Sequence, residues 1–313
     1  ISGAHSTAYE KMRDVEIVGV ADTDMIAAQK AAARHGTRAY ASLEMLLDHE
    51  QPDMVDICTP TYTHAQLAVS ALTRKVHVLC EKPMAIDEES AGMMLDAAGG
   101  NDRLLMIAQV IRFWPAYAYL KKVYEEKTYG RLLEARFTRI GQSPAWGAWF
   151  ADQAKSGLSP LDLHIHDTDF ILHMLGLPRS VSSIGMPDDG RNNYLLTRYY
   201  YGGMHVMAEG GWYEAPIPFE MGYRAVFEKA AVYYVGDRLT LYPTKGETRE
   251  IQPEECPAYA ASADAYFNEI RYCIDCIQDN AYPVLADPES TLHSLTVVQK
   301  EIQSARAGIP VDI

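Results

Sequence analysis

The first third of the chain alternates apolar runs with helical segments, and this alternation limits the fold more than any other feature. The expected strands are three to seven residues long, and alanine-rich or amphipathic segments separate them. The expected order is strand Val15–Ala21, helix Asp24–His35, strand Arg38–Tyr40, helix Leu43–His49, strand Met54–Cys58, helix Ala65–Thr73, strand Val76–Cys80, helix Glu88–Ala98 and strand Leu104–Val110. Strands joined by helices form right-handed crossovers, so these residues predict a Rossmann-like, doubly wound parallel sheet.

The pattern changes after Arg112-Phe113-Trp114-Pro115. A helix from Ala116 to Glu126 precedes long alternating runs, and Gly202-Gly203 between two of them indicates a hairpin turn. The expected strands are Leu132–Ile140, Tyr194–Tyr201, Met204–Trp212, Phe219–Glu228 and Arg238–Tyr242, followed by helices Ser262–Gln278 and Pro288–Ala307. We therefore expect an α/β chain of two domains: residues 1–113 carry the parallel sheet, and residues 114–313 form an α+β domain with an open, mainly antiparallel sheet.

Composition excludes several classes of partner. The formal charge of −14 on 313 residues, without a basic cluster, argues against nucleic acid and anionic membrane surfaces. No stretch reaches the roughly 20 apolar residues of a membrane helix. The five cysteines are an odd number, and two lie in expected strands, which favours a reducing cytoplasm over a disulfide framework. A small-molecule enzyme is the class that fits.

The start of the chain lacks a feature that a dinucleotide-binding sheet normally has. Such sheets open with a strand and a glycine-rich turn, whereas here Ile1-Ser2-Gly3 runs directly into a helical segment. We expect that one strand and the first glycines precede the given sequence, so that Ser2 or Gly3 lies at the mouth of the first helix, where main-chain N–H groups face a phosphate. A fold that simply begins with a helix is the alternative.

Asp22 ends the expected strand Val15–Ala21, about 20 residues after the position of a phosphate-binding turn. An acidic side chain there accepts hydrogen bonds from the adenosine ribose hydroxyls and repels a 2′-phosphate, so NAD is favoured over NADP. The alternative role is a helix N-cap, which Asp24 could fill equally well.

Three further strand ends carry polar residues. Glu81-Lys82-Pro83 follows the strand Val76–Cys80, Thr59-Pro60 follows Met54–Cys58, and Gln109 ends Leu104–Val110. The carboxyl ends of parallel strands meet at one edge, where open α/β sheets bind ligands. Lys82 is therefore expected to act at a reacting centre, with Pro83 restricting the loop and Glu81 supporting Lys82. An ordinary turn, with Thr63 capping the next helix, remains the alternative for Thr59-Pro60.

Asp162 and His166 are four residues apart after Pro160, a residue common at a first helical position. On one α-helix they would share a face, so that the carboxylate orients the imidazole while the imidazole takes a proton from a substrate hydroxyl. Lys82 would stabilise the charge that develops on the same oxygen. A capping or core role for the pair stays open. His164 and His166 do not share a helical face, so we expect no metal site.

Other candidates are weaker. Trp146 and Trp149 precede this segment and could wall a substrate pocket or anchor their loop. Arg112 could bind a substrate hydroxyl or carboxylate, or form an interdomain salt bridge. Cys273 and Cys276 have the spacing of a metal or redox pair, but they fall in an amphipathic helix, so core or surface positions are favoured. The run Tyr199-Tyr200-Tyr201 indicates a sheet face that pairs with another subunit.

With these residues assembled, the chain resembles the glucose–fructose oxidoreductase / inositol dehydrogenase (Gfo/Idh/MocA) family over essentially its whole length. The residues that carry the resemblance are Val20-Ala21-Asp22, Cys58–His64, Glu81-Lys82-Pro83, Gln109–Phe113 and Asp162–Asp169. The resemblance implies that Lys82 lies beside the nicotinamide and the substrate hydroxyl, that Thr59, Pro60 and His64 line the cofactor cleft, and that Asp162 and His166 form the acid/base pair. It also implies a homo-oligomer that associates through the C-terminal sheet.

The chain departs from the family pattern beside the substrate. His164 stands where a glycine is often found, and the glycine cluster that usually precedes the aspartate is only Ser156-Gly157. We expect an NAD-dependent oxidoreductase that transfers hydride between nicotinamide and a secondary hydroxyl or ketone of a sugar, inositol or related polyol. The alternatives are a dihydrodiol or imine substrate on the same fold, or a nicotinamide-binding sensor without turnover.

Overall fold

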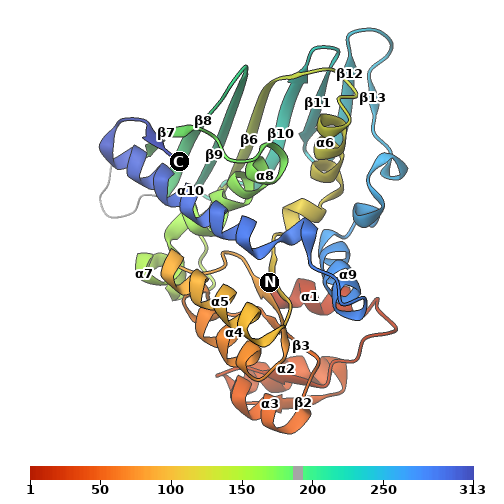
Figure 1. The fold of residues 1–313 in the computed structure, drawn as a ribbon, viewed down its shortest axis with the longest axis vertical. Helices are drawn as coiled ribbons and strands as arrows, with labels where there is room; N and C mark the ends of the chain where they lie inside the picture. Colours follow the sequence, from red (N-terminus) through yellow and green to blue (C-terminus); the bar gives the residue numbers. More distant parts are fainter. Residues whose placement is uncertain (186–192) are drawn as a thin grey trace.

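The computed structural model describes residues 1–185 and 193–313, and its N-terminal part contains the predicted parallel strands (Figure 1). β1 (Gly19–Ala21) pairs with β2 (Arg38–Tyr40), and β3 (Met54–Ile57), β4 (His77–Glu81) and β5 (Leu105–Ala108) pair in that order, all in parallel. The helix α1 (Ser2–Tyr9) precedes β1, and the helices between the strands are α2 (Met25–His35), α3 (Leu43–Glu50), α4 (His64–Thr73) and α5 (Glu88–Asn101). The doubly wound arrangement is confirmed.

The parallel strands form two groups rather than one continuous sheet. Within the described residues, β1 bonds only to β2 and β3 bonds only to β4. The strand that we expect before the given sequence, which would lie between β1 and β3 in the sheet, therefore stays a prediction.

The start of α2 decides between the two roles that the sequence left open for Asp22. The side chain of Asp24 accepts the N–H groups of Ile26 and Ala27, and Gly36 ends α2 in the left-handed region at φ 65°. Asp24, and not Asp22, thus caps this helix, which leaves Asp22 at the end of β1 for another role.

The C-terminal part is built on a nine-stranded, mainly antiparallel sheet with the order β13-β12-β11-β10-β6-β9-β8-β7-β14. Its central pair, β6 and β9, is parallel. The strands are β6 (Leu132–Gln142), β7 (Ser180–Gly185), β8 (Tyr194–Tyr201), β9 (Met204–Tyr213), β10 (Glu220–Phe227), β11 (Ala230–Val235), β12 (Arg238–Pro243), β13 (Arg249–Glu250) and β14 (Val311–Asp312). Sequence patterns missed β7, β11, β13 and β14, because two to six residues carry little periodicity.

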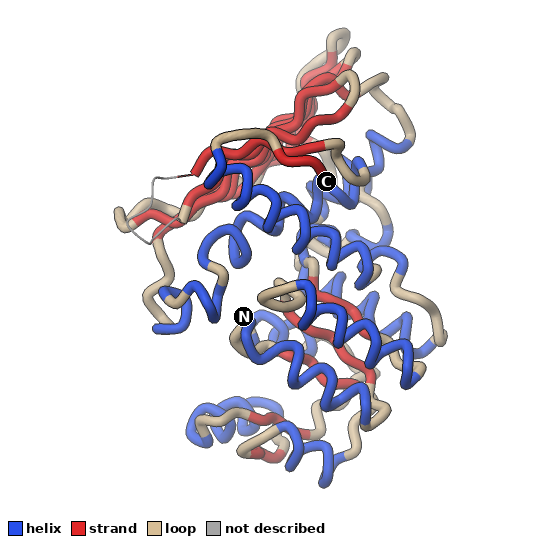
Figure 2. The backbone as a smooth tube through the Cα atoms, turned by 60° about the vertical axis from the view of Figure 1, so that its left-hand side comes forward, coloured by secondary structure: helices blue, strands red, loops and turns tan. Residues whose placement is uncertain are grey.

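Helices cover one face of this sheet and leave the other face open (Figure 2). The covering helices are α6 (Pro115–Glu125), α8 (Ile165–Leu175) and α10 (Pro288–Ala307), which contribute Tyr117, Phe170 and Val297 to a core shared with Phe137 and Val206 of the sheet. Tyr199 points into this core and is buried, whereas Tyr200 and Tyr201 are half-buried. Only part of the tyrosine run therefore faces outward.

Two C-terminal helices also pack on the parallel strands. Ile270 and Cys273 of α9 (Ala265–Gln278) share a core with Leu79 and Met106, and α10 adds Leu295 and Val298 to the core beside α5. This packing brings the carboxyl edge of β3-β4-β5 next to C-terminal segments. The domain boundary at residue 113 stays a prediction.

Cysteine placement and helix length agree with the composition. Cys273 and Cys276 are buried and unpaired, as an amphipathic helix predicts. Across the residues that the structure describes, we find no helix whose length and apolar character would let it traverse a bilayer.

Candidate active site

Lys82 lies at the carboxyl edge of the parallel strands and reaches toward the C-terminal part. β4 ends at Glu81, and the Lys82–Pro83 peptide bond that follows is cis. The Lys82 ammonium donates to the main-chain oxygen of Asp162 at 2.5 Å and lies 3.3 Å from its carboxylate oxygen Oδ1. Both side chains are mostly buried, so their charges are screened less than those of a surface pair. The structure thus brings together two residues that are 80 positions apart in the chain.

The segment that carries Asp162 differs from the α-helix we expected. Residues Pro160–His164 form a π-helical turn, η4, and the α-helix α8 begins only at Ile165. A π turn has more residues per turn than an α-helix, so positions four apart no longer lie above one another. The expected Asp162–His166 contact is accordingly wrong: among the hydrogen bonds of the described residues, the Asp162 carboxylate bonds to Lys82 and not to His166.

His166 is half-buried, and its Nδ1 has no hydrogen-bond partner in the described parts of the chain. Burial lowers the pKa of His166 well below its usual value, and the positive charges of Lys82 and Arg139 lower this pKa further. The imidazole is therefore neutral near pH 7 and has a free lone pair. A neutral histidine beside an ammonium group is suited to accept a proton from a hydroxyl.

Behind His166 lies a buried ion pair that the sequence did not reveal. Arg139 of β6 donates from Nε and Nη2 to the two carboxylate oxygens of Asp167, each at 3.0 Å, and from Nη2 to the Tyr117 hydroxyl at 3.3 Å. Both charged side chains are almost completely buried. The pair fixes the start of α8 against the sheet and so sets the position of His166.

On the other side of Lys82, His64 joins two of the predicted cofactor segments. Its Nδ1 lies 2.9 Å from the carbonyl oxygen of Pro83, and its Nε2 lies 2.9 Å from the carbonyl oxygen of Thr59. The Thr59 hydroxyl bonds to that of Thr63 at 2.7 Å, and Thr63 caps no N–H group of α4. Thr59-Pro60 and Lys82-Pro83 are therefore held side by side at one edge, as the sequence predicts.

The remaining cofactor candidates lie at ends of the same elements. Ser2 is the first residue of α1 and is exposed; Asp22 follows β1 and is also exposed. Gln109 follows β5, next to the strand that ends at Glu81. Its side chain is completely buried, yet neither amide atom has a hydrogen-bond partner among residues 1–185 and 193–313. Such an unpaired buried amide needs a partner from outside the described chain.

Arg112 has a structural partner. Its guanidinium makes a two-pronged ion pair with Asp169 of α8, with distances of 2.8 and 2.6 Å, and also bonds to Ser290 at 3.0 Å. The side chain is almost fully buried. Of the two roles that the sequence left open, the structure shows the salt bridge.

His164 also has a buried charged partner. It is completely buried and packs on Gly210 of β9, where a Cβ would lie only 2.5 Å from Nδ1. Its Nε2 is 2.8 Å from Glu301 Oε2 of α10, at ion-pair distance but not aligned as a hydrogen bond. His164 is thus accommodated by a glycine on the facing strand.

Trp149 belongs to a small aromatic cluster beside η4. It stacks on Phe150 with ring centroids 3.9 Å apart, and Phe150 packs with Trp212 and Leu163, the neighbour of Asp162. Of the two roles that the sequence left open, this packing shows the anchoring of the loop beside η4, and a substrate wall stays a prediction.

Sequence reasoning missed the pairs that support these residues, namely His5 with Asp56 and Arg139 with Asp167. Each pair joins elements that are distant in sequence, and no spacing rule connects them. Only the position of Asp56 in a buried strand, where a carboxylate needs a partner, could have signalled one of them.

Comparison with known proteins gives the same picture for both halves. Residues 1–109 match a family model described as an oxidoreductase family with an NAD-binding Rossmann fold, and residues 117–247 match the GFO/IDH/MocA C-terminal domain. In structure, the chain is similar to a levoglucosan dehydrogenase in complex with NADH and levoglucosan, with a TM-score of 0.87 and 20% identity over 99% of this chain and 95% of that one. That likeness shows the fold.

Two curated relatives show sequence similarity. The chain is 29% identical to D-glucoside 3-dehydrogenase of Escherichia coli (strain K12) over 177 residues, which are 56% of this chain and 50% of the relative. It is 32% identical to trans-1,2-dihydrobenzene-1,2-diol dehydrogenase of Sus scrofa over 175 residues, which are 54% of this chain and 51% of the relative. The chain thus spans about half the length of the curated relatives it matches.

Proposed function

Because family models for both halves match it, the chain belongs to the GFO/IDH/MocA family of oxidoreductases, and on that premise we propose that it is an NAD-dependent dehydrogenase acting on a sugar or polyol. The reaction oxidises a secondary hydroxyl of a sugar, inositol or related polyol, or reduces the corresponding ketone. The observation that carries the proposal is the meeting of Lys82, Asp162 and a neutral His166 at the carboxyl edge of the parallel strands.

In the direction of oxidation, His166 accepts the proton of the substrate hydroxyl, since its imidazole is neutral and one ring nitrogen therefore has a lone pair to receive it. The Lys82 ammonium lies where it stabilises the negative charge that develops on the same oxygen. Asp162 holds Lys82 in place through its main-chain oxygen and carboxylate. The nicotinamide, when bound, takes up the hydride.

The described residues fit such a cofactor. The N-terminus of α1, with Ser2, offers unpaired main-chain N–H groups to a phosphate, and the exposed carboxylate of Asp22 suits ribose hydroxyls. The unpaired Gln109 amide offers a donor and an acceptor at the end of β5. Because Asp22 would repel a 2′-phosphate and Thr23 carries no positive charge, NAD fits better than NADP.

For the substrate class, the names of the relatives support a carbohydrate. Trp149 and its aromatic neighbours border η4, and aromatic rings suit the apolar face of a sugar. The similarity to a dihydrodiol dehydrogenase makes a cyclic trans-diol the second candidate. Arg112 and His164 each lie against a buried carboxylate, of Asp169 and Glu301 respectively, and we assign them a supporting role rather than a contact with substrate.

The test is turnover with NAD and a panel of sugars, inositols, polyols and a trans-dihydrodiol, followed by the absorbance of the reduced nicotinamide. In His166→Ala turnover should fall by about 10²- to 10⁴-fold, the usual contribution of a proton-transfer group, and in Lys82→Met by about 10²- to 10³-fold, that of a charge-stabilising donor, while NAD still binds. Lys245→Met and His205→Ala change exposed residues and serve as matched controls.

Full activity in both site variants would exclude this mechanism. Tight NAD binding by the wild type without turnover on the whole panel would instead favour a nicotinamide-binding sensor.

We also propose a homo-oligomer that associates through the open face of the nine-stranded sheet. Support comes from the absence of a covering helix on this face among the described elements and from its outward tyrosines, Tyr200 and Tyr233. Light scattering of the purified protein measures the mass, and Tyr200→Glu with Tyr233→Glu should lower it. Five unpaired cysteines support a reducing compartment such as the cytoplasm.

A further inference from the structure

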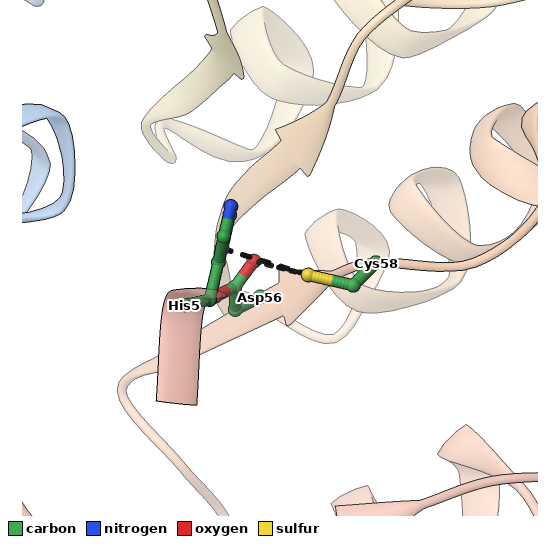
Figure 3. A group of neighbouring side chains, drawn as sticks. All are labelled: His5, Asp56 and Cys58. Atoms are coloured by element: carbon green, nitrogen blue, oxygen red, sulfur yellow. Dashed lines mark hydrogen bonds and ion pairs between the residues drawn. The ribbon is translucent and has the colours of Figure 1, made fainter. Parts of the chain in front are cut away.

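A buried polar cluster lies directly behind the Lys82 loop, and its centre is His5 of α1. His5 Nδ1 is 2.8 Å from Asp56 Oδ2, and His5 Nε2 is 3.0 Å from Glu81 Oε1. Asp56 also accepts the Tyr9 hydroxyl at 2.9 Å, and the Cys58 thiol lies 3.5 Å from Asp56 Oδ1. Figure 3 shows His5, Asp56 and Cys58 turned toward one another from α1 and the end of β3.

The geometry makes His5 an imidazolium ion, because each ring nitrogen faces a carboxylate oxygen. Burial alone would lower the pKa of His5, but the charge and hydrogen bond of Asp56, with further hydrogen bonds from Cys58 and Glu81, raise this pKa well above its ordinary value. Burial and the Asp56 charge also raise the pKa of the Cys58 thiol, to about 12. Ligand atoms of His5, Asp56 and Cys58 all lie within 4.8 Å of one another.

Two groups of α9 complete the surroundings. The Tyr266 ring centroid lies 5.7 Å from that of His5, and the carboxyl group of Glu269 is completely buried without a hydrogen-bond partner in the described parts of the chain. Burial and the nearby Glu81 charge raise the pKa of Glu269 well above its ordinary value, so this group is neutral. Of the groups that face the cluster from α1, β3, β4 and α9, His5 thus carries the positive charge that offsets Asp56 and Glu81.

The same ring joins three segments of the predicted cofactor edge. His5 lies one helical turn from Ser2, the first residue of α1. Asp56 lies on β3, three residues before Thr59, and the second oxygen of Glu81 accepts the main-chain N–H of Lys82 at 3.0 Å. Loss of the His5 charge would leave two uncompensated carboxylates behind a site for an anionic ligand, and would release α1 from β3 and β4.

We propose that His5 is a positioning residue for the dinucleotide: it clamps the phosphate-facing helix α1 to the ends of β3 and β4 and offsets the two carboxylates beneath the anionic cofactor. The proposal rests on the proposed function only through NAD binding. It assigns to the charge of His5 an effect that an uncharged residue of similar size cannot replace.

The test measures the NAD dissociation constant without substrate, by titration calorimetry at several pH values. His5→Gln should weaken NAD binding by about tenfold or more at pH 8. The loss should shrink toward pH 5.5, because one of the two carboxylates then takes up a proton, whereas wild-type affinity should change little. Glu81→Gln in the His5→Gln background should restore most of the affinity at pH 8, since the amide oxygen still accepts the Lys82 N–H.

A packing role alone would not be relieved by low pH or by removal of a second charge. His35→Gln is the matched control: His35 Nε2 also bonds to α1, at Ser6 Oγ (3.1 Å), but with no carboxylate. This control should bind NAD within twofold of the wild type.

Equal NAD affinity in His5→Gln and wild type would overturn the proposal, and so would a loss that neither low pH nor Glu81→Gln relieves. If His5→Gln does not fold, the double variant decides: the proposal requires it to fold and bind NAD. A wild-type protein that does not bind NAD overturns both this proposal and the proposed function. NAD binding without turnover overturns only the latter.

Discussion

Two histidines lie on opposite sides of Lys82, and their surroundings set them to opposite charge states. On the cofactor side, His5 sits between the carboxylates of Asp56 and Glu81, which hold it as an imidazolium. On the substrate side, burial and the cations Lys82 and Arg139 keep His166 neutral. Both rings are mostly removed from water, so neighbours and not exposure decide which form is present.

The difference between the two histidines shows how one edge of the parallel strands can hold a fixed charge on one side of Lys82 and a proton acceptor on the other. On the cofactor side each ring nitrogen of His5 has a partner, so the ring is fixed and its charge is compensated. On the substrate side the imidazole of His166 is neutral, so it can take up a proton during a reaction. Lys82 connects the two, since Glu81 holds its main-chain N–H and Asp162 holds its ammonium.

The largest expected effect on stability comes from replacing the aspartate that pairs with Arg139 or the one that pairs with His5 by asparagine. Asp167→Asn leaves Arg139 buried, charged and without its partner, because a guanidinium does not lose its proton in proteins. We expect the free energy of unfolding to fall by about 3–5 kcal/mol, equally at pH 6 and pH 9. Chemical denaturation at both pH values measures it.

Asp56→Asn should behave differently because a histidine can lose its proton. The raised pKa of His5 gives stability that is complete below pH 6.5 and declines as pH rises toward the folded-state pKa. Asp56→Asn brings that pKa down, so its cost should be greater at pH 6 than at pH 9. A cost of Asp56→Asn that is independent of pH would mean that His5 is not charged in the native protein.

A second, smaller test concerns His173 of α8, another histidine that burial and nearby cations keep neutral. Burial, with the charges of Arg112 and Lys121, lowers the pKa of His173 to about 2. Between pH 6.5 and this value His173 is therefore protonated in the unfolded chain but neutral in the folded protein. Stability from this residue is therefore lost as pH falls below 6.5, by at most about 1.4 kcal/mol per pH unit.

His173→Gln removes this titration, so at pH 5 the variant should have gained up to about 2 kcal/mol on the wild type relative to their difference at pH 7. Denaturation midpoints at pH 7, 6 and 5 give the comparison. His293→Gln, an exposed residue of α10, is the matched control and should show no such gain. Parallel pH curves for wild type and His173→Gln would show that His173 is protonated as easily in the folded state as in the unfolded one.

The features that could be predicted from the sequence also differ between the two sides of Lys82. Periodicity and caps predicted α10 and β8 with their observed ends, and strand ends correctly brought Thr59, Lys82 and Gln109 to one edge. These features depend on residues close in sequence. The π turn at Pro160–His164 was missed because its residues satisfy the same start signals as an α-helix, and the extra residue per turn is decided by packing against β9 and α10.

Charge states are the part that no local pattern contains. His5 and His166 both lie in helices, and nothing around either in the chain separates an imidazolium from a neutral base. Asp56, Glu81, Lys82 and Arg139 separate them, and they come from other strands. The different charge states of the two histidines can therefore be assigned only once the fold shows which residues surround each of them.

The smallest expected effect is on the pH dependence of catalysis, and it follows from the neutral state of His166. A general base acts only when unprotonated, so kcat/KM, which reports the free enzyme, should fall on the acid side with a midpoint below pH 6.5. Arg139→Met with Asp167→Leu replaces the buried pair by apolar groups, an exchange that is often tolerated. The exchange removes both charges of the pair, and because the Arg139 charge is the one of the two that lowers the pKa of His166, it should move that midpoint upward by a fraction of a pH unit. The exposed pair Arg249–Glu255, changed in the same way, should leave the midpoint in place. A wild-type midpoint above pH 6.5, or a downward shift in the buried double variant, would show that His166 is not the base, and the contrast with His5 would lose its functional meaning.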